Sequence, residues 1–397
     1  MIVNLDNKQF RNGLNKLCKV ASLTATDSYV SQIKFNAKNK IFYGEVINET
    51  KTQSLIVKFD ETVCSIQEPG SCCVPAKALQ QTAELLLGDT IELSSDNNML
   101  NIKSLPYKKQ NELQSIEGLN PDQWLSIGKM ESDNVLELHR DFFLDVGRFT
   151  ANGCSTDKSK APLTAIHITI FTDGRIQCTA TDYVRISLYD CKNGIKDGKI
   201  ENDLTFMLPV DVAKKIPQIF EKDIDVIKAK IDSKRISLQG GNIIFGFSTE
   251  AGVDRYPPLR SYLFDDMNVN CRVELPNLMR IAGLLSAVAP KSPCNITFNQ
   301  GEVCFDAQEN RNKSRQLLET ETCIVKNDIT LPQDIKIAVY DLISSLSIPT
   351  ADKINIGLVS IKNNAFGHLL EIRQATDDIM WRQIILKARD IIPEEAT

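Results

Sequence analysis

The sequence predicts an α+β fold built from three repeated domains. Two observations predict it: a segment that joins a short apolar strand, a proline and an amphipathic helix recurs along the chain, and β-hairpin patterns follow each recurrence. A chain of 397 residues has room for two or three domains that each bury a core. The repeat favours three, over residues 1–130, 131–267 and 268–397.

A proline marks the helix in each recurring segment. The segments are CCVPAKALQQTAELL at 72–86, FMLPVDVAKKIPQIF at 206–220 and ITLPQDIKIAVYDLI at 329–343. Proline suits the first turn of a helix, where its missing N–H would have no partner. We therefore expect a helix to begin at Pro75, Pro209 and Pro332, which follow one another at 134 and 123 residues. This period has the length of a domain.

An amphipathic helix also opens each predicted domain, because apolar residues recur there at spacings of three and four. The apolar positions are Phe10, Leu14, Leu17 and Ala21; Leu138, Phe142, Val146 and Phe149; and Leu275, Leu278, Ile281, Ala282 and Leu285. Alternating runs broken by turn residues predict a strand pair after every helix. Those runs are 31–46, 89–104, 163–181, 225–248, 294–309 and 352–374. Periodicity alone leaves open a chance recurrence of common patterns, but the shared order of elements argues against chance.

Composition indicates a folded, soluble chain. Hydrophobic residues make up 42% and charged residues 24%, and the net charge of −5 argues against a surface that is basic all over. No segment approaches the roughly 20 apolar residues of a membrane span, and the first residues lack the apolar core of a secretion signal. Eleven cysteines without a C-x-x-C spacing predict reduced, mostly buried thiols in a cytoplasmic protein, rather than disulfides or a metal site.

Catalytic chemistry has little support in the sequence. The histidines are His139, which falls on an expected helix, and His167 and His368, which fall in strand patterns. No P-loop, G-x-G-x-x-G, G-x-S-x-G or H-E-x-x-H motif is present. We therefore expect a protein without enzymatic activity and without a cofactor.

Three segments carry a resemblance to a known family. TATDYVRIS at 179–187 resembles the A-T-D-G-H-R-L motif of the β subunit of bacterial DNA polymerase III, the DNA sliding clamp. EPGSCCVPAKAL at 68–79 resembles that family's E-P-G and V-P-A-R-K segment, and DRYPPLRSYL at 254–263 resembles its F-P-D-Y-x-x-V-L-P segment. The three occur in the family's order, and the resemblance extends over nearly the whole chain. It implies that Asp182 is structural rather than catalytic.

The resemblance implies an architecture and a function. Each domain would place two helices inside and antiparallel sheets outside, and two chains would close head to tail into a homodimeric ring. Such a ring encircles double-stranded DNA and tethers the replicative polymerase for processive DNA replication. Ring closure would also pair sheet edges that otherwise invite aggregation.

A sliding ring needs positive charge toward phosphates without side chains that recognise bases. We expect this charge on the helices and on the loop at 152–163, which matches the family's DNA-contacting loop but lacks its aromatic residues. The candidate DNA-binding residues are Lys8, Asn12, Asn15, Lys19, Lys77, Arg140, Arg148, Lys158, Lys160, Lys214, Lys215, Arg280 and Lys336. For any single residue, the alternative of an ordinary solvated helix face stays open.

The resemblance also implies a pocket where polymerase and clamp-loader subunits insert a short apolar peptide. By matching, its residues are Leu163, Thr181, Tyr183, Val184, Arg185, Ile186, Pro257, Tyr262, Ile384 and Ile385. Tyr183-Val184 stands in place of the family's Gly-His, and IILKARD with the acidic tail IIPEEAT replaces its M-P-M-R-L ending. These departures keep a second hypothesis open, that the chain is a clamp-derived interaction module without a role in processivity.

Overall fold

The structure is a computed structural model. It describes residues 1–24, 28–96, 98–105, 113–125, 130, 132–232, 234–326, 329–360 and 368–385. The distinctive C-terminal tail and most of the predicted boundary region at 126–131 lie outside this range. None of the described helices is long and apolar enough to span a membrane.

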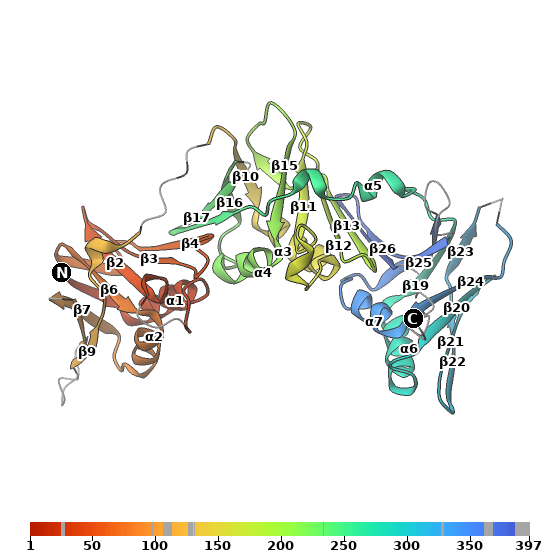
Figure 1. Ribbon diagram of the computed structural model, residues 1–397, viewed down its shortest axis with the longest axis horizontal. Coiled ribbons are helices and arrows are strands. Elements are labelled where there is room, and N and C mark those ends of the chain that lie inside the picture. Colours follow the sequence, from red (N-terminus) through yellow and green to blue (C-terminus); the bar gives the residue numbers. More distant parts are fainter. Residues whose placement is uncertain are drawn as a thin grey trace, which may run out of the picture. The chain divides into compact units, whose positions relative to one another are not determined.

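The described residues repeat one order of elements three times: a strand, a helix, five strands, a second helix and three strands (Figure 1). The first repeat contains β1 (Ile2–Asp6), α1 (Asn7–Leu17), β2 (Gln32–Lys38), β3 (Ile41–Ile47), β4 (Gln53–Phe59), β5 (Cys64–Glu68), β6 (Gly70–Pro75), α2 (Ala76–Leu85), β7 (Thr90–Asp96), β8 (Met99–Leu105) and β9 (Leu113–Glu117). The predicted alternation of helices and strand pairs is confirmed, and a strand precedes each opening helix.

The second and third repeats have the same order. The second contains β10 (Val135–His139), α3 (Arg140–Thr150), β11 (Ala165–Ile170), β12 (Ile176–Thr181), β13 (Arg185–Cys191), β14 (Ile195–Asp197), β15 (Leu204–Pro209), α4 (Val210–Ile219), β16 (Val226–Ile231), β17 (Arg235–Gly240) and β18 (Ile243–Ser248). The third contains β19 (Val269–Glu274), α6 (Leu275–Val288), β20 (Pro293–Asn299), β21 (Glu302–Glu309), β22 (Asn312–Glu319), β23 (Thr322–Val325), β24 (Gln333–Ala338), α7 (Val339–Leu346), β25 (Lys353–Ser360), β26 (His368–Ala375) and β27 (Ile379–Ile385). The short helix α5 (Leu259–Tyr262) lies between them.

The prediction that a helix begins at a proline is confirmed at two of the three positions. Pro75 and Pro209 end strands β6 and β15, and α2 and α4 begin at the next residue. Pro332 instead precedes strand β24, and α7 begins only at Val339, so the prediction of a helix starting at Pro332 is wrong. Proline is equally tolerated just before a strand, because that position needs no ladder hydrogen bond. His139 likewise ends strand β10 rather than lying on a helix.

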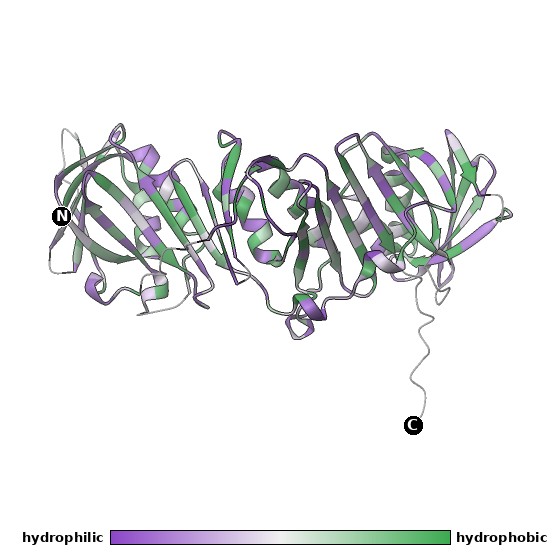
Figure 2. Cartoon of the chain, turned by 90° about the horizontal axis from the view of Figure 1, so that it is seen from above, coloured by the Kyte–Doolittle hydropathy of each residue, from purple (hydrophilic) through white to green (hydrophobic). Residues whose placement is uncertain are grey.

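Local sequence accounts for the opening helices. In α1 the Asp6 carboxylate accepts a hydrogen bond from the Gln9 N–H at 2.8 Å, which caps the first turn. Phe10, Leu14 and Leu17 are buried along one stripe of the helix. Alternation of hydrophobic and hydrophilic residues along the strands gives the sheets one face toward the core (Figure 2).

Two nine-stranded sheets contain pairings between strands that are far apart in sequence. One sheet has the order β14-β10-β16-β17-β18-β4-β3-β2-β6, and the other has the order β15-β11-β12-β13-β27-β26-β25-β19-β23. Strand β18 pairs antiparallel with β4, and β27 pairs antiparallel with β13. The smaller sheets are β5-β1-β7-β8-β9 and β22-β21-β20-β24. In both nine-stranded sheets, a strand of one repeat extends the sheet of the repeat before it.

The chain divides into two compact units. Unit 1 contains Met1–Asp141, Ile195–Ile200 and Lys214–Thr249; unit 2 contains Phe142–Gly194, Glu201–Ala213 and Glu250–Thr397. Each unit therefore holds one complete repeat and part of the middle one. The three-domain division stays a prediction that rests on the repeated order of elements.

Candidate functional site

The turn between β12 and β13 is held by its own side chains. The Asp182 carboxylate accepts hydrogen bonds from the N–H groups of Val184 at 2.9 Å and Arg185 at 2.7 Å. The Thr181 hydroxyl donates to the Arg185 carbonyl at 2.8 Å and accepts from the Tyr183 N–H at 3.1 Å. Asp182 and Thr181 therefore shape the turn, and the hydroxyl of Thr181 is occupied within it.

Tyr183 and Val184 form the exposed tip of this turn. Tyr183 has φ +72° and is 62% exposed, while Val184 is 45% exposed. The left-handed region is unfavourable for a bulky side chain, whereas glycine enters it freely. The structure thus gives the reason for glycine at this position in the resembling motif, and shows that tyrosine is held here against its backbone preference.

Arg185 ties the turn to helix α7. Its guanidinium donates to the Asp182 carboxylate at 2.7 Å and to the Ser344 hydroxyl at 2.9 Å, and lies 3.9 Å from the Asp341 carboxylate. Burial raises the pKa of Asp341, although the positive charge of Arg185 acts in the opposite direction. The side chain of Arg185 therefore links the turn directly to α7.

The apolar residues predicted to form a pocket belong to two neighbouring clusters. Ile186 lies opposite Ile384 on the paired strands β13 and β27, and Arg185 lies opposite Ile385. Ile186 and Ile384 pack in a buried cluster whose other members are Leu188, Leu263, Val359 and Leu369. Leu163 instead packs in a second cluster, with Ala165, Met207 and Tyr256. The structure brings Ile186 and Ile384 together and places Leu163 apart from them.

The strap, residues 253–267, carries α5 and contributes to both clusters. Its Leu259 packs against the two clusters, and Leu263 is buried in the first. Of the two predicted strap residues, Pro257 is partly buried and Tyr262 is 45% exposed. Among the apolar predicted pocket residues, Tyr183, Val184 and Tyr262 are thus exposed, and Pro257 is partly exposed.

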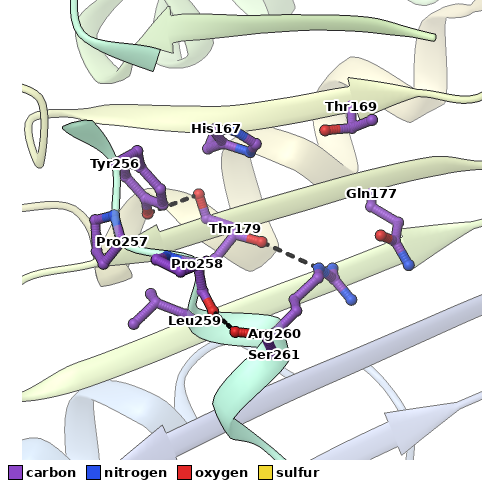
Figure 3. A pocket seen from close by; sticks show the side chains of 10 residues that line it. All are labelled: His167, Thr169, Gln177, Thr179, Tyr256, Pro257, Pro258, Leu259, Arg260 and Ser261. Carbon is purple, nitrogen blue, oxygen red and sulfur yellow. Dashed lines mark hydrogen bonds between the residues drawn. The ribbon is translucent and has the colours of Figure 1, made fainter. Parts of the chain in front are cut away.

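A pocket of about 330 Å³ opens beside the strap, over strands β11 and β12 (Figure 3). Its lining residues are His167, Thr169, Gln177, Thr179, Tyr256, Pro257, Pro258, Leu259, Arg260 and Ser261. Pro257 alone belongs to the predicted peptide pocket. For the four lining residues on the strands, the sequence signal was the alternation along 167, 169, 177 and 179, which places them on one face of the two strands.

Stacking and ion pairing give this pocket its form. The rings of His167 and Tyr256 are stacked with centroids 5.0 Å apart, and burial together with the Arg260 charge lowers the pKa of His167. Arg260 pairs with Asp190 at 2.8 Å and donates to the Thr179 hydroxyl at 3.1 Å (Figure 3). The charge of Arg260 is therefore compensated, and His167 favours its neutral form.

Buried charges that sequence analysis missed fasten the far end of the strap. Glu371 is fully buried and accepts hydrogen bonds from Arg382 at 2.8 Å and from Arg373 at 2.7 Å. Arg382 also donates to the Phe264 carbonyl, and Arg373 to the Asp265 carbonyl, each at 2.6 Å. A buried carboxylate is stable only with such partners, so the cluster fixes the strap to β26 and β27.

Most of the predicted DNA-binding side chains lie at the surface. The exposed ones are Lys8, Asn12, Asn15, Lys19, Lys77, Arg148, Lys158, Lys160, Lys214, Arg280 and Lys336. Lys215 is partly buried and donates to the Gln53 carboxamide at 2.8 Å. Lys158 and Lys160 lie on a single 3-10 turn, and the Asp157 carboxylate caps it by accepting a hydrogen bond from the Ser159 N–H at 3.0 Å.

Two of the predicted DNA-binding residues need correction. Arg140 is only 8% exposed, donates to the Phe220 carbonyl at 2.9 Å and pairs with Asp141 at 3.3 Å. Its guanidinium is therefore mostly buried and is engaged by partners within the chain. Lys336 lies on strand β24, opposite Asn295 on β20, rather than on a helix. The burial of Arg140 depends on a non-local partner, whereas Lys336 was expected on a helix because a helix was predicted to begin at Pro332.

Comparison with known proteins finds distant relatives that are named as beta sliding clamps. No protein-family profile matches the chain. It is 20% identical over 237 residues to the beta sliding clamp of Bacillus subtilis strain 168, and 24% identical over 242 residues to that of Staphylococcus aureus strain N315. These segments cover 60% and 59% of this chain. The chain spans about three fifths of the length of these relatives, 60% and 61%.

Solved structures show the same fold over almost the full length. The DNA polymerase sliding clamp from Bacillus subtilis superposes with a TM-score of 0.85 at 16% identity, covering 98% of this chain and 99% of that one. The beta subunit from the DNA polymerase of Streptococcus pyogenes gives a TM-score of 0.86 at 16% identity, covering 98% and 100%. The α+β fold class is therefore confirmed.

Proposed function

Because the chain is a divergent member of the bacterial beta sliding clamp family, we propose that two copies close into a ring around double-stranded DNA and hold a replicative polymerase there. On this proposal the protein acts by topology and docking, without catalysis. The relatives it matches are named as clamps, which supports this choice at the level of the family.

The pattern of strand pairing between repeats carries the proposal. In two cases, the last strand of one repeat pairs with the fourth strand of the repeat before it: β18 with β4, and β27 with β13. Among the described residues, the same rule leaves β9, the last strand of the first repeat, and β22, the fourth strand of the third, without such a partner at the edges of their sheets. Pairing β9 of one chain with β22 of another completes the rule and closes a head-to-tail assembly.

The surfaces of these two edges fit an interface. Leu113 on β9 is 58% exposed, and Leu317 on β22 is 55% exposed. Edge strands with exposed apolar side chains invite pairing with another chain unless they are covered. Pairing the two edges in a head-to-tail contact would cover both and remove this liability.

A dimerisation test follows from the two edges. Leu113→Asp or Leu317→Asp should each convert the dimer into a monomer, because a desolvated aspartate without a partner is costly at an interface. Sedimentation at micromolar concentration measures the mass, and Ile41→Asp, at an exposed isoleucine on β3, serves as the matched control. A wild-type monomer would contradict the ring.

The proposal that the protein binds DNA rests on exposed lysines, which can attract phosphates without recognising bases. Lys158, Lys160 and Lys214 are free of the burial seen at Arg140. Reversing all three to glutamate should weaken salt-sensitive association with DNA by about tenfold or more at low salt, and should leave the dimer intact. Lys38→Glu, an exposed lysine on β2, is the control, and retention on nicked circular DNA is the measurement.

Partner docking is proposed at the exposed Tyr262, beside the cluster of Ile186 and Ile384, with the tip of Tyr183 and Val184 as the rim that limits access. The double variant Tyr183→Gly and Val184→His restores the residues of the resembling motif. It should bind a consensus clamp-binding peptide more tightly than the wild type, because glycine relieves the left-handed strain and opens the tip. Equal affinity would show that the tip does not control peptide access.

Processivity separates the proposal from the alternative of an interaction module. With clamp loader and polymerase present, the wild type should lengthen primer-extension products per binding event. The Leu317→Asp variant should lose that effect. Unchanged product length with a wild-type dimer on DNA would favour the interaction module.

A further inference from the structure

Two cysteines face each other across neighbouring strands in the third repeat. Cys271 on β19 lies directly opposite Cys323 on β23 in the antiparallel register. Their sulfurs are 3.0 Å apart, with the Cys271 thiol donating to the sulfur of Cys323. The Cys323 thiol in turn donates toward the Asn299 carbonyl at 3.9 Å. The two side chains are therefore already aligned toward one another.

The environments of the two thiols differ in a way that orders their reactivity. Cys271 is fully buried, whereas Cys323 is partly exposed on the edge strand β23. Burial raises the pKa of the Cys271 thiol, and the neighbouring sulfur raises it further. An external reagent would thus meet Cys323 first, because thiol exchange requires access and thiolate character.

Other cysteines of this chain provide a contrast. The adjacent Cys72 and Cys73 occupy consecutive positions of strand β6, so their side chains point to opposite faces of the sheet. Cys64, which is partly exposed like Cys323, lies on edge strand β5 opposite Leu5 of β1. Accessibility alone therefore does not distinguish Cys323 from Cys64. The difference is that Cys323 has another cysteine, Cys271, directly opposite it.

We propose that Cys271 and Cys323 are an oxidisable pair that a low-molecular-weight disulfide converts into a cross-strand disulfide. The Cys323 thiolate attacks the reagent disulfide, forming a mixed disulfide and releasing one thiol. The Cys271 thiolate then attacks the Cys323 sulfur and releases the second thiol. Two protein thiols are oxidised, one reagent disulfide is reduced to two thiols, and the protons lost by the cysteines end on the released thiols.

The position of the bond gives it a consequence for the fold. It would close a covalent loop over residues 271–323, which contains α6 and strands β20, β21 and β22. It would also fasten β23, which ends its sheet, to β19. A loop of this length restrains the unfolded chain, so oxidation should raise the melting temperature of unit 2. This inference does not depend on ring formation or on DNA binding.

The experiment uses the full chain and glutathione disulfide as the probe. The folded protein is incubated with the probe, alkylated, digested and mapped by mass spectrometry. The expected product is a peptide pair linked through Cys271 and Cys323 with the loss of two hydrogen atoms and no retained glutathione. The same treatment in concentrated urea should lose this preference, because the sulfurs are then no longer opposite each other.

Matched variants test the order of the two steps. In Cys271→Ser, Cys323 should stop at the mixed disulfide with glutathione. Wild-type Cys64, as the internal control, should also stop there. In Cys323→Ser, buried Cys271 should stay unmodified, and this second variant keeps the test valid if Cys271→Ser fails to fold.

The melting temperature provides an independent measurement. The oxidised wild type should melt about 5 °C above the reduced form, and the Cys323→Ser variant should show no such rise. A wild-type Cys323 that remains a mixed disulfide would overturn the proposal. Linkage of Cys323 to a different cysteine in the folded protein would also overturn it.

Discussion

Helices α1 and α2 of unit 1 and helices α6 and α7 of unit 2 occupy the same places in the repeat, yet they present different surfaces. The solvent side of α1 and α2 carries Lys8, Asn12, Asn15 and Lys77, and the exposed large apolar residue there is Leu85, the last residue of α2. On α6 and α7, the exposed large side chains are instead Met279, Leu284, Arg280 and Tyr340. Conserving the architecture of a repeat therefore does not conserve its charge. If both pairs face DNA, the first supplies most of the electrostatic attraction.

The same helices also differ in how closely they pack. A Cβ added at Gly13 of α1 would lie 2.6 Å from the Phe59 ring, which packs in turn against Phe10 and Phe42. A Cβ added at Gly283 of α6 would meet no atom within 4 Å. The glycine of α1 permits close packing on strand β4, whereas the glycine of α6 serves no packing purpose in the chain as described.

Substituting both glycines by alanine tests this contrast and should give the largest effect. Gly13→Ala should lower the free energy of unfolding by about 1–3 kcal/mol, because the aromatic ring is enclosed and cannot move aside easily. Gly283→Ala should raise it by about 0.5–1 kcal/mol, through the higher helix propensity of alanine. Urea unfolding measures both; equal shifts would show that the two helices pack alike.

Charge reversal tests the electrostatic difference. Lys8→Glu together with Lys77→Glu should reduce the slope of log affinity for DNA against log salt by about 1.8, if each lysine contacts one phosphate. Arg280→Glu, on the other helix pair, should change the slope by about half as much. Fluorescence anisotropy with a DNA duplex over a salt series gives the slopes. Identical slopes for all variants would remove the helices from the DNA interface.

Adding charge to the weaker pair should reduce the contrast. Tyr340 is 69% exposed and is the second residue of α7, the same place that Lys77 holds in α2. Tyr340→Lys should steepen the salt slope by about 0.9 for one added phosphate contact. Tyr340→Gln is the neutral control, and a steeper slope with glutamine would point to an effect of the ring rather than of charge.

The smallest expected effect concerns pH and the ion pair at the start of α7. Burial raises the pKa of Asp341 above its ordinary value of 3.8. A group with a raised folded pKa contributes stability below its unfolded pKa, and this contribution is lost as pH rises through the folded value. The Asp341→Asn variant has no carboxyl group to ionise and does not lose this stability. The difference in unfolding free energy, variant minus wild type, should therefore increase between about pH 4 and pH 7. A constant difference across that range would show that Asp341 titrates normally.

The sequence predicted those parts of the fold that depend on local patterns. The stripe of Phe10, Leu14 and Leu17 and the alternating strand runs identified most elements, because their periods are visible within a few residues. The error at Pro332 had a local remedy, since Ile335 and Ile337 are buried in alternation along β24. The proline was interpreted as the start of a helix, although the alternation at 333–338 already indicated a strand.

What the sequence alone did not indicate depends on contacts between distant segments. Burial of Arg140 requires the carbonyl of Phe220, and the buried Glu371 requires Arg382 from another strand. The pocket at His167 exists only because the strap crosses β11 and β12. The family resemblance placed Ile186 and Ile384 in one pocket, which no local pattern indicates, and the structure adds that their strands pair.

The pairing of β4 with β18, and of β13 with β27, has a consequence for how the chain is made. In both cases about 190 residues separate the partners, so the ribosome completes one strand long before the other exists. At synthesis rates of about 5–20 residues per second, β4 and then β13 would each wait about 10–40 s as an open edge. The nascent chain must therefore be protected from association with its neighbours during that interval. The high sequence separation of these contacts also favours slow completion of both sheets.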